Sequence, residues 1–324
     1  MDDEVDRKKT SPVSRAPEHF FGRVLRPGEL LDHASYSTPR PMSERLRPFV
    51  KRYWAVEWDL PPGESYRTST VSEPTVNLTF EFGSSRRANT DGPGVWVTGP
   101  VTERRFDVGI FGRGGVLGVN FHLGATLAFA DLSPSRIRNS TVAAADWFPT
   151  LEADLGLTGA FSPASKEEPH RHETGGARTG KPQAGRTAGG LDLAGLAASV
   201  EGWLLSRRPQ MSPGYTRLQH VLNVLADPEV VSLRLLSQRT GIGERTLQRM
   251  FDRYCGVGVK KILARARIID AVGALDRGWD GTLAELGAQY GWFDQSHFGA
   301  DFLTVTGYSP GEYARWSPRR FNRG

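Results

Sequence analysis

The sequence of 324 residues has few of the features that mark secreted, membrane-embedded or metal-binding proteins. Its one cysteine, Cys255, excludes an internal disulfide bond and any zinc site built from several cysteines. It contains no uncharged apolar run of about 18 residues, the length that a membrane-spanning helix requires. Its opening residues, MDDEVDRKK, are not followed by an apolar segment of the kind found in secretory signals. We therefore expect a protein of the reducing cytoplasm that has no membrane partner.

The excess of positive over negative charge is also small, since the net charge is only +5. The charges are, however, unevenly distributed along the chain. Residues 207–267 hold 12 basic and 4 acidic side chains, whereas residues 268–314 hold 1 basic and 7 acidic side chains. Residues 315–324 add four arginines and no acid. A basic block such as 207–267 is typical of a surface that meets phosphate groups, although a solvated helical surface would have the same composition.

Composition also divides the chain into segments. Residues 158–190 contain seven glycines and three prolines but no valine, isoleucine, leucine or methionine. Such a segment cannot bury enough apolar surface to offset the entropy lost on ordering. The expected organisation is a disordered tail (1–18), a β-rich domain (19–157), a disordered linker (158–190), a helical domain (191–315, with its core at about 215–315) and a basic tail (316–324).

Period-two alternation marks the β-rich segment. Between residues 76 and 82 every second residue is apolar and those between are polar, which predicts a strand with one buried face. The pattern recurs at 54–58 and 119–123, and several short strands at this spacing predict a small barrel or sandwich. Five aromatic residues of these strands could line a ligand pocket or could simply form the core: Trp54, Trp58, Phe80, Trp96 and Phe121.

Nothing in the sequence favours enzyme chemistry. The segment GRGGVLG (112–118) is superficially similar to a phosphate-binding loop, but a strand pattern follows where a dinucleotide fingerprint needs a helix, so a hairpin turn is predicted. Cys255 has no convincing partner base, and His170 and His172 lie in the linker without further metal ligands. The sequence therefore predicts no enzyme activity, no catalytic residues, no cofactor and no metal site.

Two stretches of the helical domain, 231–251 and 283–302, have the pattern of a helix-turn-helix. In the first, Gly241 suits the turn because glycine adopts positive φ without strain, and a second glycine lies 50 residues further along. Asp294 is expected to cap the second helix of the second unit. Residues 260–275, between the units, have the length and periodicity of one connecting helix.

The second helix of the first unit has one polar face. Arg245, Gln248 and Arg249 are spaced i, i+3 and i+4, so they share a side of the helix. Such a face can enter the ~12 Å wide major groove of DNA, where arginine pairs with guanine and glutamine with adenine. An ordinary solvated helix could carry the same residues, so the spacing alone does not decide between the two.

The paired units, the connecting helix and the terminal GYSPGEY (307–313) together resemble the DNA-binding domain of AraC/XylS-type transcription regulators, over roughly residues 215–315. The resemblance implies two helix-turn-helix subdomains, joined by a rigid helix, that read adjacent major grooves on one face of double-stranded DNA. It places seven residues in the DNA-binding set: Glu244, Arg245, Gln248 and Arg249 in the first recognition helix, and Gln295, Ser296 and His297 in the second.

The chain departs from the family pattern in places. The family commonly has basic residues at the positions of Ala300 and Leu303, and serine or threonine at that of Gly243. The missing basic residues at the positions of Ala300 and Leu303, together with the net negative charge of residues 268–314, are expected to weaken the binding of DNA phosphates by the second unit. We expect DNA affinity to come mainly from the first unit, helped by the arginines of the tail: Arg315, Arg319, Arg320 and Arg323.

Segments 47–61, 73–82, 97–100 and 115–125 resemble a β-rich module found in some regulators of this type. That resemblance implies a cupin-like barrel with a sensory or dimerisation role. The expected fold class is therefore α+β multidomain, with a β-rich N-terminal domain (cupin-like barrel or sandwich) and an all-α C-terminal domain that contains two helix-turn-helix units.

These features together predict a sequence-specific DNA-binding transcription regulator, modulated by a small ligand or by dimerisation at the N-terminal domain. The alternative is a ligand- or partner-binding sensor whose helical domain has lost productive DNA binding. Beside double-stranded DNA, the partners left open are a small-molecule effector, a second copy of the chain and, for an activator, RNA polymerase.

Overall fold

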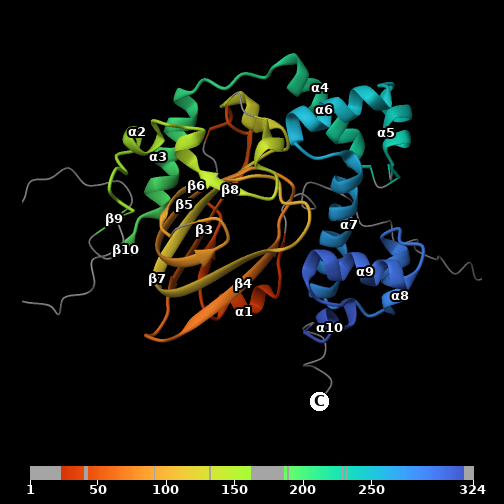
Figure 1. The fold of residues 1–324 in the computed structure, drawn as a ribbon, viewed down its shortest axis with the longest axis horizontal. Helices are drawn as coiled ribbons and strands as arrows, with labels where there is room; N and C mark the ends of the chain where they lie inside the picture. The colour runs from red at the N-terminus through yellow and green to blue at the C-terminus, as the bar shows by residue number, and fades with distance from the viewer. Residues whose placement is uncertain are drawn as a thin grey trace, which may run out of the picture.

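The computed structural model describes residues 23–39, 43–90, 92–130, 133–161, 186–187, 190–227, 229–230 and 232–316. The expected N-terminal tail, nearly all of the expected linker and the tail after Trp316 lie outside these residues, so the division of the chain into domains stays a prediction. Within the described residues, a β-rich part and a helical part lie side by side (Figure 1).

An eight-stranded antiparallel sheet forms the β-rich part. Its strands follow the order β1-β4-β7-β5-β6-β8, and β3 joins β7 while β2 joins β3. The strands are β1 (Arg23–Val24), β2 (Ser35–Ser37), β3 (Val50–Asp59), β4 (Ser65–Val71), β5 (Asn77–Arg87), β6 (Gly94–Thr98), β7 (Phe106–Phe121) and β8 (Thr141–Ala143).

The central strand, β7, is 16 residues long and pairs with three others. It runs antiparallel to β5, while its first half pairs with β4 and its second half with β3. The glycine-rich segment 112–118 lies inside this strand, so the prediction of a hairpin turn there is wrong. The glycines are required because the indoles of Trp54 and Trp58 lie over Gly118 and Gly114, where a Cβ would overlap the rings.

The two faces of the sheet differ in what they pack against. Leu78, Phe80 and Phe121 are buried on the outer face, which confirms the strand predicted for residues 76–82, but Thr79 and Glu81 of the opposite face are buried as well, so the prediction of a single buried face is wrong. The outer core is covered by α3 (Leu193–Ser206), whose Trp203 meets Phe148 at 5.3 Å between ring centroids. The polar residues of the opposite face are not in solvent, because they line a cavity.

Short elements complete the β-rich part. They are α1 (Pro27–Leu31), the 3₁₀ turns η2 (Ala125–Ala128), η3 (Pro134–Ile137) and η4 (Ala144–Asp146), α2 (Leu151–Asp154) and the strand pair β9 (Arg186–Thr187) and β10 (Gly190–Leu191).

The helical part contains two groups of helices joined by one long helix. The long helix, α7 (Val259–Asp276), confirms the connecting helix predicted for residues 260–275, and Figure 1 shows it running between the two groups. The first group is α4 (Pro213–Leu225), α5 (Leu233–Thr240) and α6 (Glu244–Cys255), and the second is α8 (Leu283–Gln289), α9 (Gln295–Thr306) and α10 (Pro310–Ala314).

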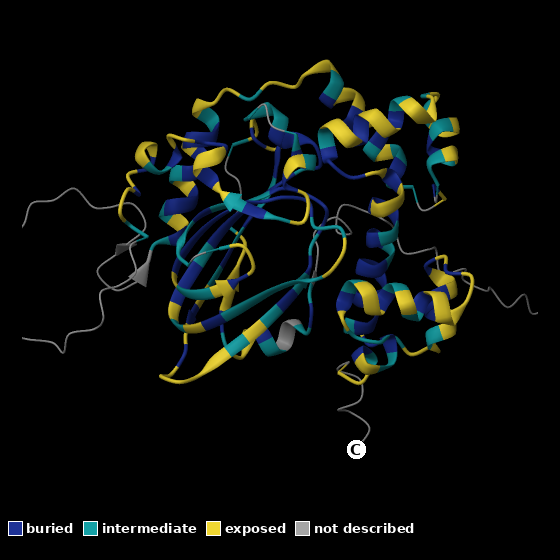
Figure 2. Ribbon diagram, in the orientation of Figure 1, coloured by how far each residue is buried: buried dark blue, intermediate teal, exposed yellow. Residues whose placement is uncertain are grey.

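The apolar cores tie the helical part to the sheet. One continuous core extends from the outer face of the sheet through α3 and α4 to α5 and α6. A second core lies inside the α8–α10 group and includes Leu25 and Val71 from the β-rich part. Figure 2 shows these buried residues between the elements, with exposed residues on the outer sides of the helices. No helix among the described residues is both long and apolar enough to cross a membrane.

Candidate nucleic-acid interface and the neighbouring cavity

The first helix-turn-helix unit consists of α5, a short turn and α6. Ser232 caps α5 by accepting a hydrogen bond from the backbone N–H of Leu235. Gly241 ends α5 with φ of 68°, the left-handed conformation that the sequence predicts for this turn. The buried faces of the two helices meet through Leu236 and Phe251, which have 0% relative exposure.

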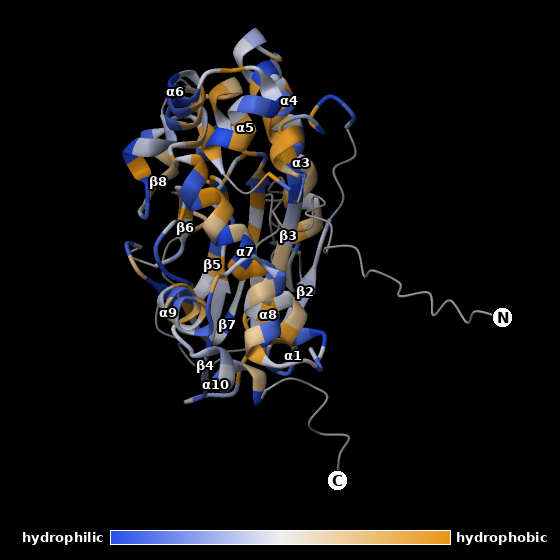
Figure 3. Ribbon diagram, turned by 90° about the vertical axis from the view of Figure 1, so that its right-hand side faces the viewer, coloured by the Kyte–Doolittle hydropathy of each residue, from blue (hydrophilic) through white to orange (hydrophobic). Residues whose placement is uncertain are grey.

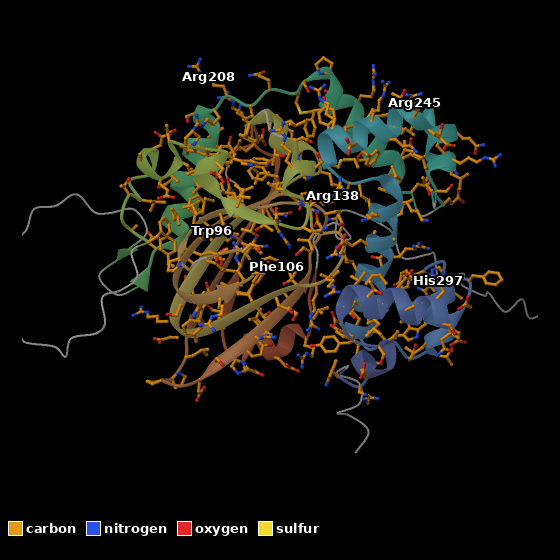
Figure 4. All side chains as sticks on the ribbon, viewed as in Figure 1. Trp96, Phe106, Arg138, Arg208, Arg245 and His297 are labelled. Carbon is orange, nitrogen blue, oxygen red and sulfur yellow. The ribbon has the colours of Figure 1, made fainter. Side chains whose placement is uncertain are left out.

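The opposite face of α6 is polar and open to solvent. All four of its predicted DNA-binding residues, Glu244, Arg245, Gln248 and Arg249, are exposed. Among the described residues, neither Arg245 nor Arg249 has an ion-pair partner, so both guanidinium groups are available to a phosphate or a base edge. Figure 4 shows Arg245 on the outer side of this group of helices.

The second unit, α8 and α9, has better capped helices and a less charged surface. Thr282 and Glu285 form a capping box at the start of α8. The Asp294 side chain accepts a hydrogen bond from the backbone N–H of His297 at 2.7 Å, which confirms the predicted cap of α9. Each predicted DNA-binding residue of α9 is exposed: Gln295, Ser296 and His297.

Apolar side chains share the exposed surface of α9. Leu303 is 49% exposed, and Phe293, in the turn before the helix, is 99% exposed. Ala300 is exposed as well. The surface of α9 can therefore contact apolar groups such as thymine methyls but offers no arginine or lysine to phosphate.

The two recognition helices lie on the same side of the molecule. In Figure 3, α6 and α9 both lie toward one edge of the view, with α7 connecting the two groups. This arrangement allows both helices to face one partner surface. The helices that carry the first and second sets of predicted residues thus lie on a common side.

A buried arginine of α7 joins the helical part to the β-rich part. Arg265 is 2% exposed and donates hydrogen bonds to the backbone carbonyls of Ser72 at 2.5 Å and Arg104 at 3.1 Å. Burial lowers the pKa of its guanidinium group to about 10. The basic composition of residues 207–267 therefore includes at least one charge that serves this contact and not DNA.

Two arginines of the β-rich part bind the second unit in return. Arg105 donates to the carbonyl of Thr306 at 2.8 Å and lies 4.7 Å from the ring centroid of Tyr308. The Arg26 side chain donates to the Tyr308 hydroxyl at 3.2 Å and lies over the Trp316 ring. The C-terminal end of α9 and the segment after it are thereby fixed to the sheet.

The first unit is attached through other segments. Arg138, just after η3, donates from Nε to the carbonyl of Gly256 at the end of α6, at 2.7 Å. The Tyr215 hydroxyl of α4 donates to the carbonyl of Pro48 at 2.6 Å. Figure 4 places Arg138 between the sheet and the helical part.

The inner face of the sheet encloses a cavity of about 420 Å³, a size within the usual range for small-molecule sites. Of the aromatic residues for which the sequence left both a pocket and a core role open, Trp54 and Trp58 line the cavity. Phe80 and Phe121 belong to the outer core. The apolar part of the lining comprises Val24, Leu30, Leu31, Trp54, Val56, Trp58, Val101, Phe106, Val108, Ile110 and Val116.

One end of the cavity is polar: the Arg52 side chain lines it beside Asn120, its partner in the strand register, and two buried oxygen atoms there have no hydrogen-bond donor among the residues that the structure describes. The Glu73 side chain is bound through Oε1 to Nζ of Lys51 at 2.7 Å, but its Oε2 has no hydrogen-bond donor. Asn120 donates to Thr75 and Asn77, and its Oδ1 also lacks a donor. Both side chains line the cavity, and Glu73 and Asn120 are 3% and 4% exposed.

Burial shifts the pKa values of groups near this end. It lowers the pKa of Lys51 to about 8 and raises that of Glu73, while their ion pair opposes both shifts. Burial lowers the pKa of His122 to about 4, with a smaller contribution from the Lys51 charge, so its ring is neutral near pH 7.

A second buried ion pair, between Arg87 and Glu81, lines the cavity and is part of a hydrogen-bond network. The Arg87 guanidinium group donates to both carboxylate oxygens of Glu81, to Thr98 and to Thr141. This pair balances its own charge and needs no ligand. Among the described residues, no group of three or more histidine, cysteine, aspartate or glutamate side chains is arranged to hold a metal ion.

Sequence reasoning missed the polar lining and the contacts between the two parts. The alternation at 76–82 contained a usable signal, because Asn77, Thr79 and Glu81 are unusually polar for a strand beside a core, but nothing in it distinguishes a cavity from solvent. Arg105 and Arg265 carry no local signal, since their partners lie 201 and up to 193 residues away.

Comparison with known proteins identifies two matched regions. Residues 236–315 match a helix-turn-helix domain family, and residues 39–143 match a domain family of unknown function, DUF6597. No curated protein matches the chain at a significant level.

Solved structures that match the chain include ToxT from Vibrio cholerae, at 8% identity and a TM-score of 0.40, over 82% of this chain and 99% of that one. A ToxT structure with an unsaturated fatty acid bound matches at 10% identity and a TM-score of 0.37, over 82% and 96%. The C-terminal domain of AraT, a response regulator from Geobacillus stearothermophilus, matches at 20% identity and a TM-score of 0.28, over 33% of this chain and 87% of that one.

Proposed function

We propose that the chain is a DNA-binding transcription regulator of the AraC type, which binds specific DNA sequences by placing α6 and α9 in adjacent major grooves of one duplex; in support, residues 236–315 match a helix-turn-helix domain family. The expected contacts are those of Glu244, Arg245, Gln248 and Arg249 from α6, and of Gln295, Ser296 and His297 from α9.

One observation carries this proposal. The exposed face of α6 holds Arg245, Gln248 and Arg249 in the open, while its other face is anchored by Leu247 and Phe251 in the core. A rigid helix that presents two arginines and a glutamine without internal ion-pair partners can form bidentate contacts with guanine and adenine edges. The common side shared by α6 and α9 supports simultaneous contact with one DNA face.

We further propose that the cavity of the β-rich part is an effector site. Its walls are built from the segments that hold the second unit. Ser72 lines the cavity and its carbonyl binds Arg265; Phe106 lines the cavity and follows Arg105, which binds Thr306. Val24 also lines the cavity, and the next residue in the chain packs in the core of the second unit.

Occupation of the cavity would therefore favour or oppose the docked position of α9. A ligand biases DNA binding only to the extent that its affinity differs between the two positions. Dimerisation and, for an activator, contact with RNA polymerase are further proposals that the described surfaces do not test.

The regulator proposal is tested by binding of the full chain to duplex DNA from the neighbourhood of its own gene, in a salt series with nonspecific competitor. We expect site-selective binding whose logarithm falls steeply with the logarithm of salt concentration, because protein cations displace condensed counterions. Arg208→Ala is the control for loss of one charge, since Arg208 is exposed and distant from Arg245 in Figure 4. Binding without any site preference would contradict the proposal.

The second candidate function is a ligand or partner sensor that no longer binds DNA. The exposed Phe293 and Leu303, together with the acidic balance of residues 268–314, favour it. It predicts that the full chain ignores DNA at every salt concentration, which the same titration would reveal.

A further inference from the structure

A second hollow in the β-rich part lies where β5 ends and β7 begins, and its volume is about 630 Å³. It adjoins the cavity, because Arg87, Thr98, Val101 and Phe106 line both spaces. The charged side chains of its lining are Arg67, Arg86, Arg87, Glu103, Arg104, Arg105 and Asp107. Cations therefore outnumber anions in this hollow by five to two.

Two of these arginines are neutralised by the protein itself. Arg87 is buried, and its guanidinium group pairs with the Glu81 carboxylate. Nε of Arg105 lies 2.9 Å from Oδ1 of Asp107, and the same side chain donates to the Thr306 carbonyl. These two guanidinium groups are committed to internal contacts and need no ligand.

Three arginines of the hollow remain. Within the ranges that the structure describes, the guanidinium groups of Arg67, Arg86 and Arg104 form no hydrogen bond or ion pair, and all three residues are exposed. The remaining acid of the lining, Glu103, is exposed and has its carboxylate 4.0 Å from Nζ of Lys261. Three cations against one anion leave the hollow with an excess of two positive charges even when Glu103 is counted in full.

The sheet places two of these arginines on either side of one glycine. Gly109 of β7 is the register partner of Arg67 in β4 and of Arg86 in β5. Directly opposed residues share a face of the sheet, so the Cα atoms of the two arginines lie on one face, about 10 Å apart at twice the strand spacing. A Cβ added at Gly109 would meet only the carbonyl oxygen of Arg86, at 3.6 Å. The gap between the arginines is therefore open to a group that both guanidinium groups can bind.

The hollow lies away from the predicted DNA contacts. Its Arg105 binds the C-terminal end of α9, and its Asn139 follows Arg138, which binds the carbonyl of Gly256 at the C-terminal end of α6. The predicted DNA contacts lie in the first two turns of both helices, as is usual for a recognition helix. This position and the concave shape favour a small molecule over a duplex as the occupant.

From these features we infer that the hollow binds a small molecule through a phosphate monoester group, which lies over Gly109 between Arg67 and Arg86. A phosphate monoester carries about two negative charges near pH 7, which matches the excess of positive charge, whereas a carboxylate or a phosphodiester carries one. Guanidinium groups bind phosphate oxygens through paired hydrogen bonds. The inference does not depend on the proposed DNA binding, and its test uses the protein without DNA.

The test measures binding of three aromatic anions to the full-length protein by equilibrium dialysis at constant ionic strength, at about pH 7.5, where a monoester is doubly charged. Phenyl phosphate is a monoester, methyl phenyl phosphate is a singly charged diester like the DNA backbone, and benzoate is a singly charged carboxylate. We expect phenyl phosphate to bind at least tenfold more tightly than either of the others. Equal or tighter binding of the diester or of benzoate would overturn the inference, as would absence of phenyl phosphate binding at millimolar concentration.

Four variants locate the bound phosphate. Arg67→Gln and Arg86→Gln each remove one flanking cation and should weaken phenyl phosphate binding about tenfold. The control is Arg136→Gln, which removes an exposed arginine outside the lining of the hollow and should leave binding unchanged. Gly109→Glu places a carboxylate in the gap and should abolish binding, so unchanged binding in this variant would exclude the site.

Thermal melts of each variant show whether it is folded. If Gly109→Glu fails to fold, the comparison of the Arg67 and Arg86 variants with Arg136→Gln still tests the site, because all three arginines are exposed. The same variants are titrated with duplex DNA. Weaker DNA binding by Arg67→Gln and Arg86→Gln, with phenyl phosphate binding unchanged, would assign these arginines to the DNA backbone and overturn the inference.

Discussion

The two helix-turn-helix units share a backbone plan but differ in what they offer to a partner. The recognition helix of the first unit exposes Arg245 and Arg249, whereas that of the second exposes Ala300 and Leu303 at its corresponding surface. The first has no side-chain cap at Gly243, whereas the second is capped by Asp294. The same local fold therefore supports one charged and one nearly uncharged surface.

Their attachment to the β-rich part differs as well. The second unit is held directly by Arg26 and Arg105, and indirectly by Arg265 through α7, whose C-terminal half packs in the core of that unit; these contacts involve segments that line the cavity or adjoin its lining. The first unit is held by Arg138 and Tyr215, which contact segments outside the cavity lining. This difference suggests a division in which the first unit supplies DNA affinity and the second responds to the cavity.

The largest expected effect is on DNA affinity in the first unit. Arg249→Ala should weaken specific DNA binding roughly tenfold to hundredfold, because a bidentate arginine–base contact contributes about 1–3 kcal/mol. Gln295→Ala should change affinity by less than about threefold. Titrations of both variants against one duplex measure the two affinities. Comparable losses of affinity would contradict the expectation that the first unit contributes more to DNA binding than the second.

The next effect concerns the attachment of the second unit. Arg265→Ala leaves the carbonyls of Ser72 and Arg104 without donors, which costs about 1–3 kcal/mol per buried group. Hydrogen exchange should then accelerate in residues 283–306 but not in α6. The matched control is Lys261→Ala, also on α7, whose charge lies exposed at 4.0 Å from Glu103. Uniform acceleration across both units would show that the attachment is not local.

Restoring a positive charge to the second unit should have a smaller effect. Ala300→Arg adds a cation to an exposed position of α9, so DNA affinity should rise a few-fold and the log–log salt slope should steepen by about 1. The control is Ser206→Arg, which adds the same positive charge at an exposed position outside α9. If Ala300→Arg leaves the salt slope unchanged, α9 does not approach the phosphates.

The smallest effects concern the helix caps. Asp294→Ala removes the hydrogen bond to His297 and should lower the free energy of unfolding by about 1 kcal/mol, whereas Gly243→Ser should raise it by a few tenths. Chemical denaturation of the full-length variants measures both. A stabilisation by Asp294→Ala would mean that the cap geometry has been misassigned.

The helical part followed closely from the sequence because its determinants are local. The turn at Gly241, the cap at Asp294 and the extent of α7 depend on residues within a few positions of each other. The exposed placement of Arg245 and Arg249 follows from the same helical period. Whether these side chains contact DNA is not decided by that period and stays a prediction.

The cavity and its coupling could not be predicted in the same way. Alternation at 76–82 identified a two-faced strand, but only the curvature of the whole sheet determines that the polar face encloses space. The glycines of 112–118 suggested a turn because their real partners, Trp54 and Trp58, come from a strand about 60 residues earlier. The helix α3 lies in the range predicted for the helical domain, yet it packs on the sheet through contacts that sequence periodicity cannot assign.

The most direct test of the account is selection of binding sites by the full-length protein from a pool of random duplex DNA, repeated with Arg249→Ala and with Gln295→Ala. We expect one strongly selected block of base pairs that Arg249→Ala abolishes, beside a weaker block that is altered by Gln295→Ala. Two equally strong blocks would contradict the division between the units. Absence of any enrichment would contradict sequence-specific DNA binding itself.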